Sequence, residues 1–368
     1  MTCQLRDTYY KDDLTLLGGF RTLRGTPNRK TCIFLQVRIA ICFFYLFTSF
    51  CAALGQTSSY KYIRIGQQKD AATTPSFGIA LMGGGSDLDE AFRWLCEKAN
   101  GGDFLVLRAH GDDDYNPYVN GLCKLNSVAT LIIDTRAAAQ DPAVADIIRH
   151  AEAIFIAGGD QARYVNFWRG TGVQQAINAD VAHDVPIGGT SAGLAILGEF
   201  SYGALNDPPD DSSLSSADAL RNPFFTRITL VRDFLTVPLL QNTITDSHFA
   251  KRNRLGRSLV FLARVVQDGW SAKPREIAID EKNAVLVEAD GNSRIIGSGK
   301  GAYFLSVSNP PEVCRADTPL TIRDIAVHHG PAGSRFDLRN WQGAGGTNYS
   351  LSVEAGQVHS TQPGGQIY

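Results

Sequence analysis

The sequence lacks the features that mark several large classes of protein. It has 7 cysteines in 368 residues and no paired cysteine spacing of the kind that binds zinc, which excludes a cysteine-rich zinc fold. It has no basic tract, and its formal net charge of −2 gives no reason to expect nucleic acid as a partner. It also has no internal repeat. With 44% hydrophobic residues and 36 glycines, the chain can bury a large core in one or two domains.

The N-terminal part carries one uncharged apolar run, Ile39–Gly55, which follows several positive charges such as Arg29. Signal peptides have this arrangement, and the small residues at the end of the run predict cleavage before Gln56. The run is shorter than the about 20 apolar residues that span a bilayer core, although a buried helix or a retained anchor stays open. We therefore expect residues 1–55 to be a leader and 56–74 a linker. The mature protein would be exported, periplasmic or extracellular, without stable membrane association.

Three cysteines lie beyond the expected leader: Cys96, Cys123 and Cys314. They are too few and too scattered for a disulfide scaffold. One bridge among them is compatible with an oxidising compartment.

From Pro75 onward, short apolar runs alternate with helical patterns, which predicts an α/β fold with a parallel sheet flanked by helices. The expected strands include "FGIALMGGG", "DFLVLRAHG", "VATLIID", "AEAIFIAGGD" and "VPIGGTSAG". The long stretch 250–266 has the periodicity of an amphipathic helix. From 276 onward the pattern turns to strands, which indicates a β-rich C-terminal extension of the same domain. We take 75–342 as one domain and 343–368 as a tail with an edge strand and loops.

The block "IGGTSAG", Ile187–Gly193, interrupts this pattern. Gly189, Ser191 and Gly193 fit G-x-S-x-G, in which the serine sits on a strained strand-to-helix turn and glycines allow a close backbone approach. Ser191 would project from the carboxyl end of a strand, and the N–H of Ala192 at the helix start can stabilise an oxyanion. A passive serine in a glycine-rich turn is the alternative.

A nucleophilic serine needs a base. His248 is the strongest candidate, because "TDSHF" places it where an apolar strand ends, although a structural histidine is the alternative. His110 follows another strand and could line the same cleft. Glu281 comes directly after "EIAID" and could orient the imidazole, with Asp280 as its rival. We expect Ser191, His248 and Glu281 at one sheet edge, in an order that differs from the serine, acid, histidine order of α/β-hydrolases.

Five sequence blocks follow one another in a specific order. They are "GGGSD" (83–87), "IFIAGGDQ" (154–161), "GGTSAG" (188–193), "ITDSHFAKRNRLGR" (244–257) and "IAIDEKNAVLV" (277–287). Together they resemble the cyanophycinase family of serine peptidases, whose relatives include aspartyl dipeptidases. The resemblance extends from residue 78 to about 342, and exported members are especially similar. It implies the flavodoxin-like sheet of class I glutamine amidotransferases, with serine in place of cysteine.

The resemblance implies a role for each candidate residue. Ser191 would be the nucleophile, His248 the general base and then acid, and Glu281 the carboxylate that orients His248. An acid soon after the nucleophile is the alternative, and three residues could supply it: Asp207, Asp210 or Asp211. The backbone N–H groups of Gly159 and Ala192 would donate to the oxyanion.

The resemblance also implies a substrate pocket formed by Asp160, Gln161, Asp246, Arg252, Arg254 and Arg257. The family's substrate, cyanophycin, is a poly-aspartate backbone with arginine on each β-carboxyl group. Arginines can bind its carboxylates bidentately, and carboxylates or an amide can receive its guanidinium groups. The three arginines cover more than one side of the expected helix, so we expect one or two to point inward. No metal or cofactor is implied, and a homodimer is left open.

Other functions remain as alternatives. The block "MGGGSD" after a strand suggests a dinucleotide-binding loop, but Leu88 occupies the position of the third glycine in G-x-G-x-x-G. A peptidase for aspartyl or isoaspartyl dipeptides is the alternative within the enzymes. A non-catalytic binding relative is the alternative outside them.

Overall fold

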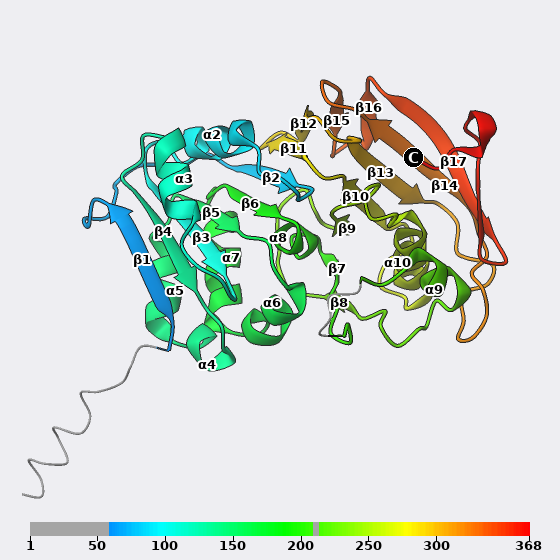
Figure 1. The fold of residues 1–368 in the computed structure, drawn as a ribbon, viewed down its shortest axis with the longest axis horizontal. Coiled ribbons are helices and arrows are strands. Elements are labelled where there is room, and N and C mark those ends of the chain that lie inside the picture. Colours follow the sequence, from blue (N-terminus) through cyan, green and yellow to red (C-terminus); the bar gives the residue numbers. More distant parts are fainter. Residues whose placement is uncertain (1–58, 209–212) are drawn as a thin grey trace, which may run out of the picture. The chain divides into compact units, whose positions relative to one another are not determined.

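The computed structural model describes residues 59–208 and 213–368. The predicted leader at 1–55 lies outside the described residues, as do Asp210 and Asp211. The described residues form two mixed β-sheets with helices packed on them (Figure 1). Among the helices of these two ranges, none has both the length and the apolar character needed to cross a membrane.

The first sheet has ten strands in the order β1-β4-β3-β5-β6-β2-β11-β12-β15-β16. Its parallel centre consists of β4 (Ser127–Ile132), β3 (Asp103–Arg108), β5 (Ala153–Ile156), β6 (Ile187–Thr190) and β2 (Gly78–Met82). Antiparallel strands complete it: β1 (Lys61–Gly66), β11 (Asn283–Glu288), β12 (Asn292–Gly297), β15 (Arg335–Asp337) and β16 (Gln342–Ala344). The central strands are buried almost throughout, as expected for parallel strands covered on both faces.

Helices cover both faces of this parallel centre (Figure 1). One face holds α2 (Asp89–Lys98) and α3 (Tyr115–Leu122), and the other holds α4 (Arg136–Ala139), α5 (Pro142–Arg149), α6 (Gln161–Trp168) and α7 (Gly172–Ala182). Alternate residues of β3 point to opposite faces. Phe104 and Val106 pack on the α2 side, whereas Leu105 and Leu107 pack on the α5 side. The predicted parallel sheet flanked by helices is therefore confirmed.

The second sheet has eight strands in the order β18-β17-β14-β13-β10-β9-β7-β8. They are β7 (Phe200–Tyr202), β8 (Leu230–Arg232), β9 (Thr243–Asp246), β10 (Arg275–Ile279), β13 (Ala302–Val307), β14 (Ile322–Gly330), β17 (Thr347–Glu354) and β18 (Gln357–Ser360). The short helices are α8 (Ala192–Ala195), α9 (Ser216–Arg221) and the 3-10 turn η1 (Pro363–Gly365). The predicted β-rich C-terminal region is present.

The helix predicted over 250–266 is α10 (Leu255–Gln267), which packs with α9 on one face of the second sheet. It begins five residues later than the apolar pattern indicated, because Asn253 adopts a positive φ of 50° that a helix cannot contain. Residues 250–254 therefore form a turn between β9 and the helix.

Two segments contain more strand than the sequence predicted. Residues 61–66, inside the predicted linker at 56–74, form β1 and pair antiparallel with β4. The ion pair between Arg64 and Asp103, at 3.0 Å, fixes this strand to β3. The tail at 343–368, predicted as an edge strand and loops, contributes two strands, because β17 pairs with both β14 and the edge strand β18. In both places long-range pairing orders a segment whose local pattern is weak.

A disulfide joins Cys96 of α2 to Cys123, the residue after α3. It links the two helices that cover the same face of the first sheet. Among the described residues, Cys314 is a free and buried cysteine.

Candidate active site

The three catalytic candidates come from two different sheets. Ser191 follows β6 of the ten-stranded sheet, whereas His248 and Glu281 follow β9 and β10, which are parallel neighbours in the eight-stranded sheet. The prediction that all three lie at one sheet edge is therefore wrong. The carboxyl ends of strands from the two sheets meet instead, and the three side chains converge where they do.

A continuous hydrogen-bond chain connects these side chains. The Ser191 hydroxyl lies 2.7 Å from Nε2 of His248, and Nδ1 of His248 lies 2.7 Å from Oε1 of Glu281. A carboxylate can only accept, so the proton belongs on Nδ1 and Nε2 is left to accept from the serine hydroxyl. The hydrogen bond from His248 lowers the pKa of Glu281. Burial lowers the pKa of His248, which favours the neutral imidazole that can take a proton.

Ser191 sits on the strained turn that G-x-S-x-G predicts. Its φ of 52° and ψ of −114° are unusual for a residue with a side chain. A Cβ on Gly189 would lie 2.6 Å from the carbonyl carbon of Gly193, and one on Gly193 would lie 2.0 Å from the carbonyl oxygen of Ile156. Both glycines are therefore required for the backbone to turn here.

The segment Gly83–Gly85, which follows β2, packs directly against the other two candidates. A Cβ on Gly84 would lie 2.5 Å from Cε1 of His248, and one on Gly85 would lie 3.1 Å from Cβ of Glu281. The His248 N–H donates to the carbonyl of Gly83 at 2.8 Å, and the Lys282 N–H donates to that of Gly84 at 2.9 Å. The glycines that suggested a dinucleotide loop thus allow close packing against the imidazole.

The rival acids have other partners. Asp280 accepts from the N–H groups of Lys251 and Lys300, so its carboxylate ties two loops together. Asp207 accepts from the Tyr202 hydroxyl at 2.8 Å and from Nε of Arg227 at 2.9 Å. Asp210 and Asp211 lie outside the described residues. Among the described carboxylates, Glu281 is the one bonded to His248.

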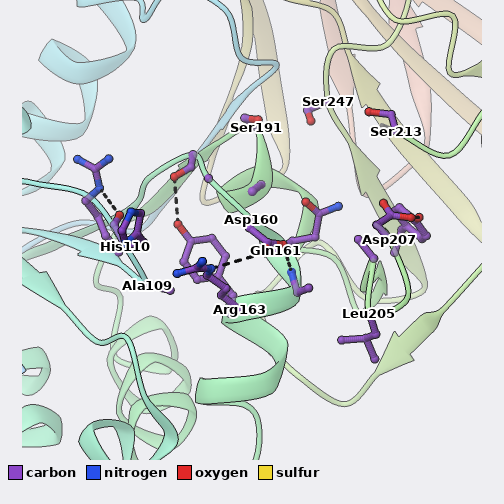
Figure 2. Close-up of a pocket in the computed structure, with 18 of the residues that line it drawn as sticks. Ala109, His110, Asp160, Gln161, Arg163, Ser191, Leu205, Asp207, Ser213 and Ser247 are labelled. Atoms are coloured by element: carbon purple, nitrogen blue, oxygen red, sulfur yellow. Dashed lines mark hydrogen bonds and ion pairs between the residues drawn. The ribbon is translucent and has the colours of Figure 1, made fainter. Parts of the chain in front are cut away.

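A cavity of about 730 Å³ opens beside Ser191. Seven of the residues predicted for the oxyanion site and the pocket line it: Gly159, Ala192, Asp160, Gln161, Arg252, Arg254 and Arg257. In Figure 2, Asp160 and Gln161 lie near the middle of the cavity. His110 and Arg163 lie toward one of its ends, and Asp207 and Ser213 lie toward the other. The arrangement is compatible with an extended substrate crossing Ser191.

Asp246 does not lie on the cavity wall as predicted. It is 3% exposed and accepts from Nε of Arg257 at 2.9 Å, from Nη2 of Arg257 at 2.5 Å and from Nη1 of Arg254 at 3.3 Å. Burial alone would raise the pKa of Asp246, but the charges of Arg257 and Arg254 outweigh it and lower the pKa. Asp246 is therefore the buried counter-ion that holds two cavity arginines in place.

The cavity also contains residues that the motifs did not indicate, chiefly Arg108, Arg163 and Tyr202. Arg108 ends β3, and Arg163 lies in the first turn of α6, two residues after the "GGDQ" block. The available signals were the strand end for Arg108 and the nearby block for Arg163. Within 59–208 and 213–368, no group of three or more histidine, cysteine or acidic side chains could hold a metal ion.

Replacing Gly84 tests whether the glycine segment positions His248. In Gly84→Ala the new methyl group would meet the imidazole, so the rate at which a fluorophosphonate labels Ser191 should fall by about 10². Gly101→Ala is the matched control, because Gly101 also has a positive φ, 76°, but has nothing within 4 Å of an added Cβ. If both folded variants lost reactivity equally, backbone strain and not the contact with His248 would be the cause.

The chain is similar in sequence to several known proteins. Cyanophycinase from Synechococcus elongatus is 27% identical over 230 residues, which cover 59% of this chain and 62% of that protein. Cyanophycinase from Trichormus variabilis is 28% identical over 220 residues, which cover 57% of this chain and 65% of that protein. The chain thus spans less than two thirds of the length of these relatives.

Among solved structures, a peptidase from an acI-B1 Actinobacterium has a TM-score of 0.45 and 17% identity, covering 62% of this chain and 90% of that one. Residues 108–293, half of the chain, match the model of peptidase family S51. The matched range includes Ser191, His248 and Glu281. The chain therefore belongs to peptidase family S51.

Proposed function

We propose that the protein is a serine peptidase that hydrolyses cyanophycin to β-Asp-Arg dipeptides through an acyl-enzyme formed on Ser191. The observation that carries the proposal is the hydrogen-bond chain that begins at Ser191, on the wall of the cavity, and continues through His248 to Glu281. Membership of family S51 and the similarity to cyanophycinases support it.

Under this proposal each step of acyl transfer is assigned to one group of the site. The Ser191 oxygen attacks the scissile carbonyl while Nε2 of His248 takes its proton, and the imidazolium then gives that proton to the leaving amine. Glu281 stays ionised and stabilises the imidazolium through Nδ1. The backbone N–H groups of Gly159 and Ala192, beside Ser191 on the cavity wall, would stabilise the oxyanion. Water then attacks the acyl group, with His248 again as the base.

The charges on the cavity wall favour a substrate that carries both signs. Arg252 is the most exposed of the three predicted arginines, with 43% of its side chain accessible. Burial, together with the charge of Arg257, lowers the pKa of Arg254 to about 9, and its Nε has no hydrogen-bond partner among the described residues. The guanidinium groups of these arginines can bind carboxylates of the substrate. Asp160 and Asp207 on the same wall can bind guanidinium groups of the substrate.

A peptidase for aspartyl or isoaspartyl dipeptides is the second candidate. The observation that favours it is the number of arginines around the cavity, since Arg108 and Arg163 add two cations to those near α10. A small substrate that has free carboxylates and no guanidinium group would not need an acidic side chain in the cavity. The intact hydrogen-bond chain at Ser191 argues against the third alternative, a non-catalytic relative.

Ser191→Ala should abolish hydrolysis and leave the fold intact, because removing the nucleophile costs several orders of magnitude in rate. Wild type and variant would be incubated with insoluble cyanophycin and with a panel of aspartyl and isoaspartyl dipeptides, and released products identified by mass spectrometry. Wild-type release of β-Asp-Arg only from the polymer supports the cyanophycinase proposal, and turnover of dipeptides alone supports the second candidate. A variant that kept about a tenth of the activity would end the assignment of Ser191.

Glu281→Gln should lower kcat by about 10² or more with little change in KM, because the amide keeps the shape of the carboxylate but loses the charge that stabilises the imidazolium. The comparison variant replaces Asp207, Asp210 and Asp211 together by Asn. If the acid lay in that loop, the triple variant would lose more kcat than Glu281→Gln, and the role given to Glu281 would be wrong. Circular dichroism establishes that each variant is folded.

A further inference from the structure

The part of the chain that follows the family match folds back onto the segment between His248 and α10. The match to family S51 ends at residue 293, and the following residues form most of the second sheet's outer strands, β13, β14, β17 and β18. The chain then returns, so that its C-terminal end lies over β13 and close to α10 (Figure 1). Its last residue, Tyr368, contacts the segment that connects His248 to α10.

The hydroxyl group of Tyr368 makes two hydrogen bonds at the start of α10. It accepts from the N–H of Leu255 at 3.0 Å and donates to Oδ1 of Asn253 at 3.1 Å. The first N–H groups of a helix have no intrahelical acceptor and need one from elsewhere. The residue at the N-cap position, Arg254, makes no side-chain cap hydrogen bond. A side chain that is 113 residues away in the sequence therefore caps the helix.

The ring of Tyr368 closes the pocket that holds Phe249. Phe249 is fully buried, and its ring centroid lies 5.7 Å from that of Tyr368 and 5.0 Å from that of Tyr303. The rings of Tyr368 and Tyr303 also meet edge to face at 5.9 Å. Three aromatic rings thus pack together, and one of them belongs to the residue directly after His248.

His248 needs such support because its backbone is strained. Its φ of 48° lies in the left-handed region, which persists in a residue with a side chain only where the surroundings enforce it. On its N-terminal side the N–H of His248 is bonded to the carbonyl of Gly83. On its C-terminal side the Arg252 N–H donates to the carbonyl of His248 at 2.9 Å and the Phe249 N–H donates to that of Ile279 at 3.3 Å. The burial of the Phe249 ring in its aromatic pocket adds a further restraint.

We propose that Tyr368 is a positioning residue for the active site: its ring fixes Phe249 and through it His248, and its hydroxyl fixes the turn that carries Arg252 and Arg254. The inference rests on the proposed function, because positioning matters only if His248 activates Ser191. It assigns a role to the C-terminal strands, which carry the tyrosine back to the site. Tyr349 anchors this return by donating its hydroxyl to the carbonyl of Ile367 at 3.1 Å.

Two substitutions separate the ring from the hydroxyl. Tyr368→Leu removes both, and the rate of fluorophosphonate labelling of Ser191 should fall by about tenfold or more, because small displacements of a catalytic base are costly. Tyr368→Phe keeps the ring and removes only the hydroxyl, whose two hydrogen bonds hold the turn that follows His248, so the labelling rate should fall less, by about threefold. KM should rise in Tyr368→Phe, since Arg252 and Arg254 lie in the turn that loses its hydrogen bonds.

Tyr62→Phe is the matched control. It removes a hydroxyl that accepts from Nη1 of Arg64, on β1, at the opposite end of the parallel centre from β2 and the glycine segment. We expect its labelling rate and KM to equal those of the wild type. Thermal unfolding of all variants shows whether a change in rate accompanies a loss of the fold.

The pH dependence of kcat/KM provides a readout that a purely structural role would not change. The groups facing His248 are Glu281, Arg252 and Arg254, and burial is the first cause of its lowered pKa. Loosening Phe249 in Tyr368→Leu lets water reach the imidazole, so its pKa should rise. Because the neutral form is the base, the acidic limb of the profile should move to higher pH.

The outcomes separate this inference from the proposed function. No labelling of wild-type Ser191 overturns both. Wild-type labelling with unchanged rates, KM and pH profile in folded Tyr368→Leu and Tyr368→Phe overturns the positioning role and leaves the proposed function standing. If Tyr368→Leu unfolds, Tyr368→Phe decides: a labelling rate and KM equal to those of Tyr62→Phe overturn the inference.

Discussion

The active site depends on the close packing of the segment Gly83–Gly85 between two sheets. One sheet supplies Ser191, and the other supplies His248 and Glu281. The backbone of the segment is bonded to His248, and a side chain at Gly84 would occupy the space of the imidazole ring. The hydrogen-bond chain can form only because this strip of backbone carries no side chains.

Around this contact the protein holds strained and charged groups in fixed positions. Ser191 and His248 both adopt positive φ values, which close packing and backbone hydrogen bonds around them maintain. Below the cavity, Asp246 binds two arginines in a site almost closed to water. Removing one partner of such a buried network would leave an unpaired charge, so its members depend on one another. The candidate catalytic groups are thus held in fixed positions, and electrostatic catalysis depends on such preorganisation.

The sequence predicted the parallel sheet from short apolar runs that alternate with helical patterns. It predicted Ser191 from the G-x-S-x-G pattern, and His248 and Glu281 from their positions after such runs. It could not predict that these runs belong to two sheets, since β6 and β9 have similar local patterns and pairing between distant strands decides their membership. The sequence also could not show that Asp246 is buried. Its partners Arg254 and Arg257 lie in the following turn and helix, and only the packing of that helix on the sheet brings them to the carboxylate. Tyr368 carried no local signal at all, since the residues that its hydroxyl binds are more than a hundred residues away.

The central claim is that a histidine from one sheet activates a serine from the other. The most direct test is to treat wild-type and His248→Ala protein with a fluorophosphonate and to locate the adduct by peptide mass spectrometry. The structure predicts one adduct on Ser191 in the wild type and almost none in folded His248→Ala, because without the base the hydroxyl remains protonated. Labelling of Ser191 at the same rate in both proteins, or of another residue instead, would contradict this account.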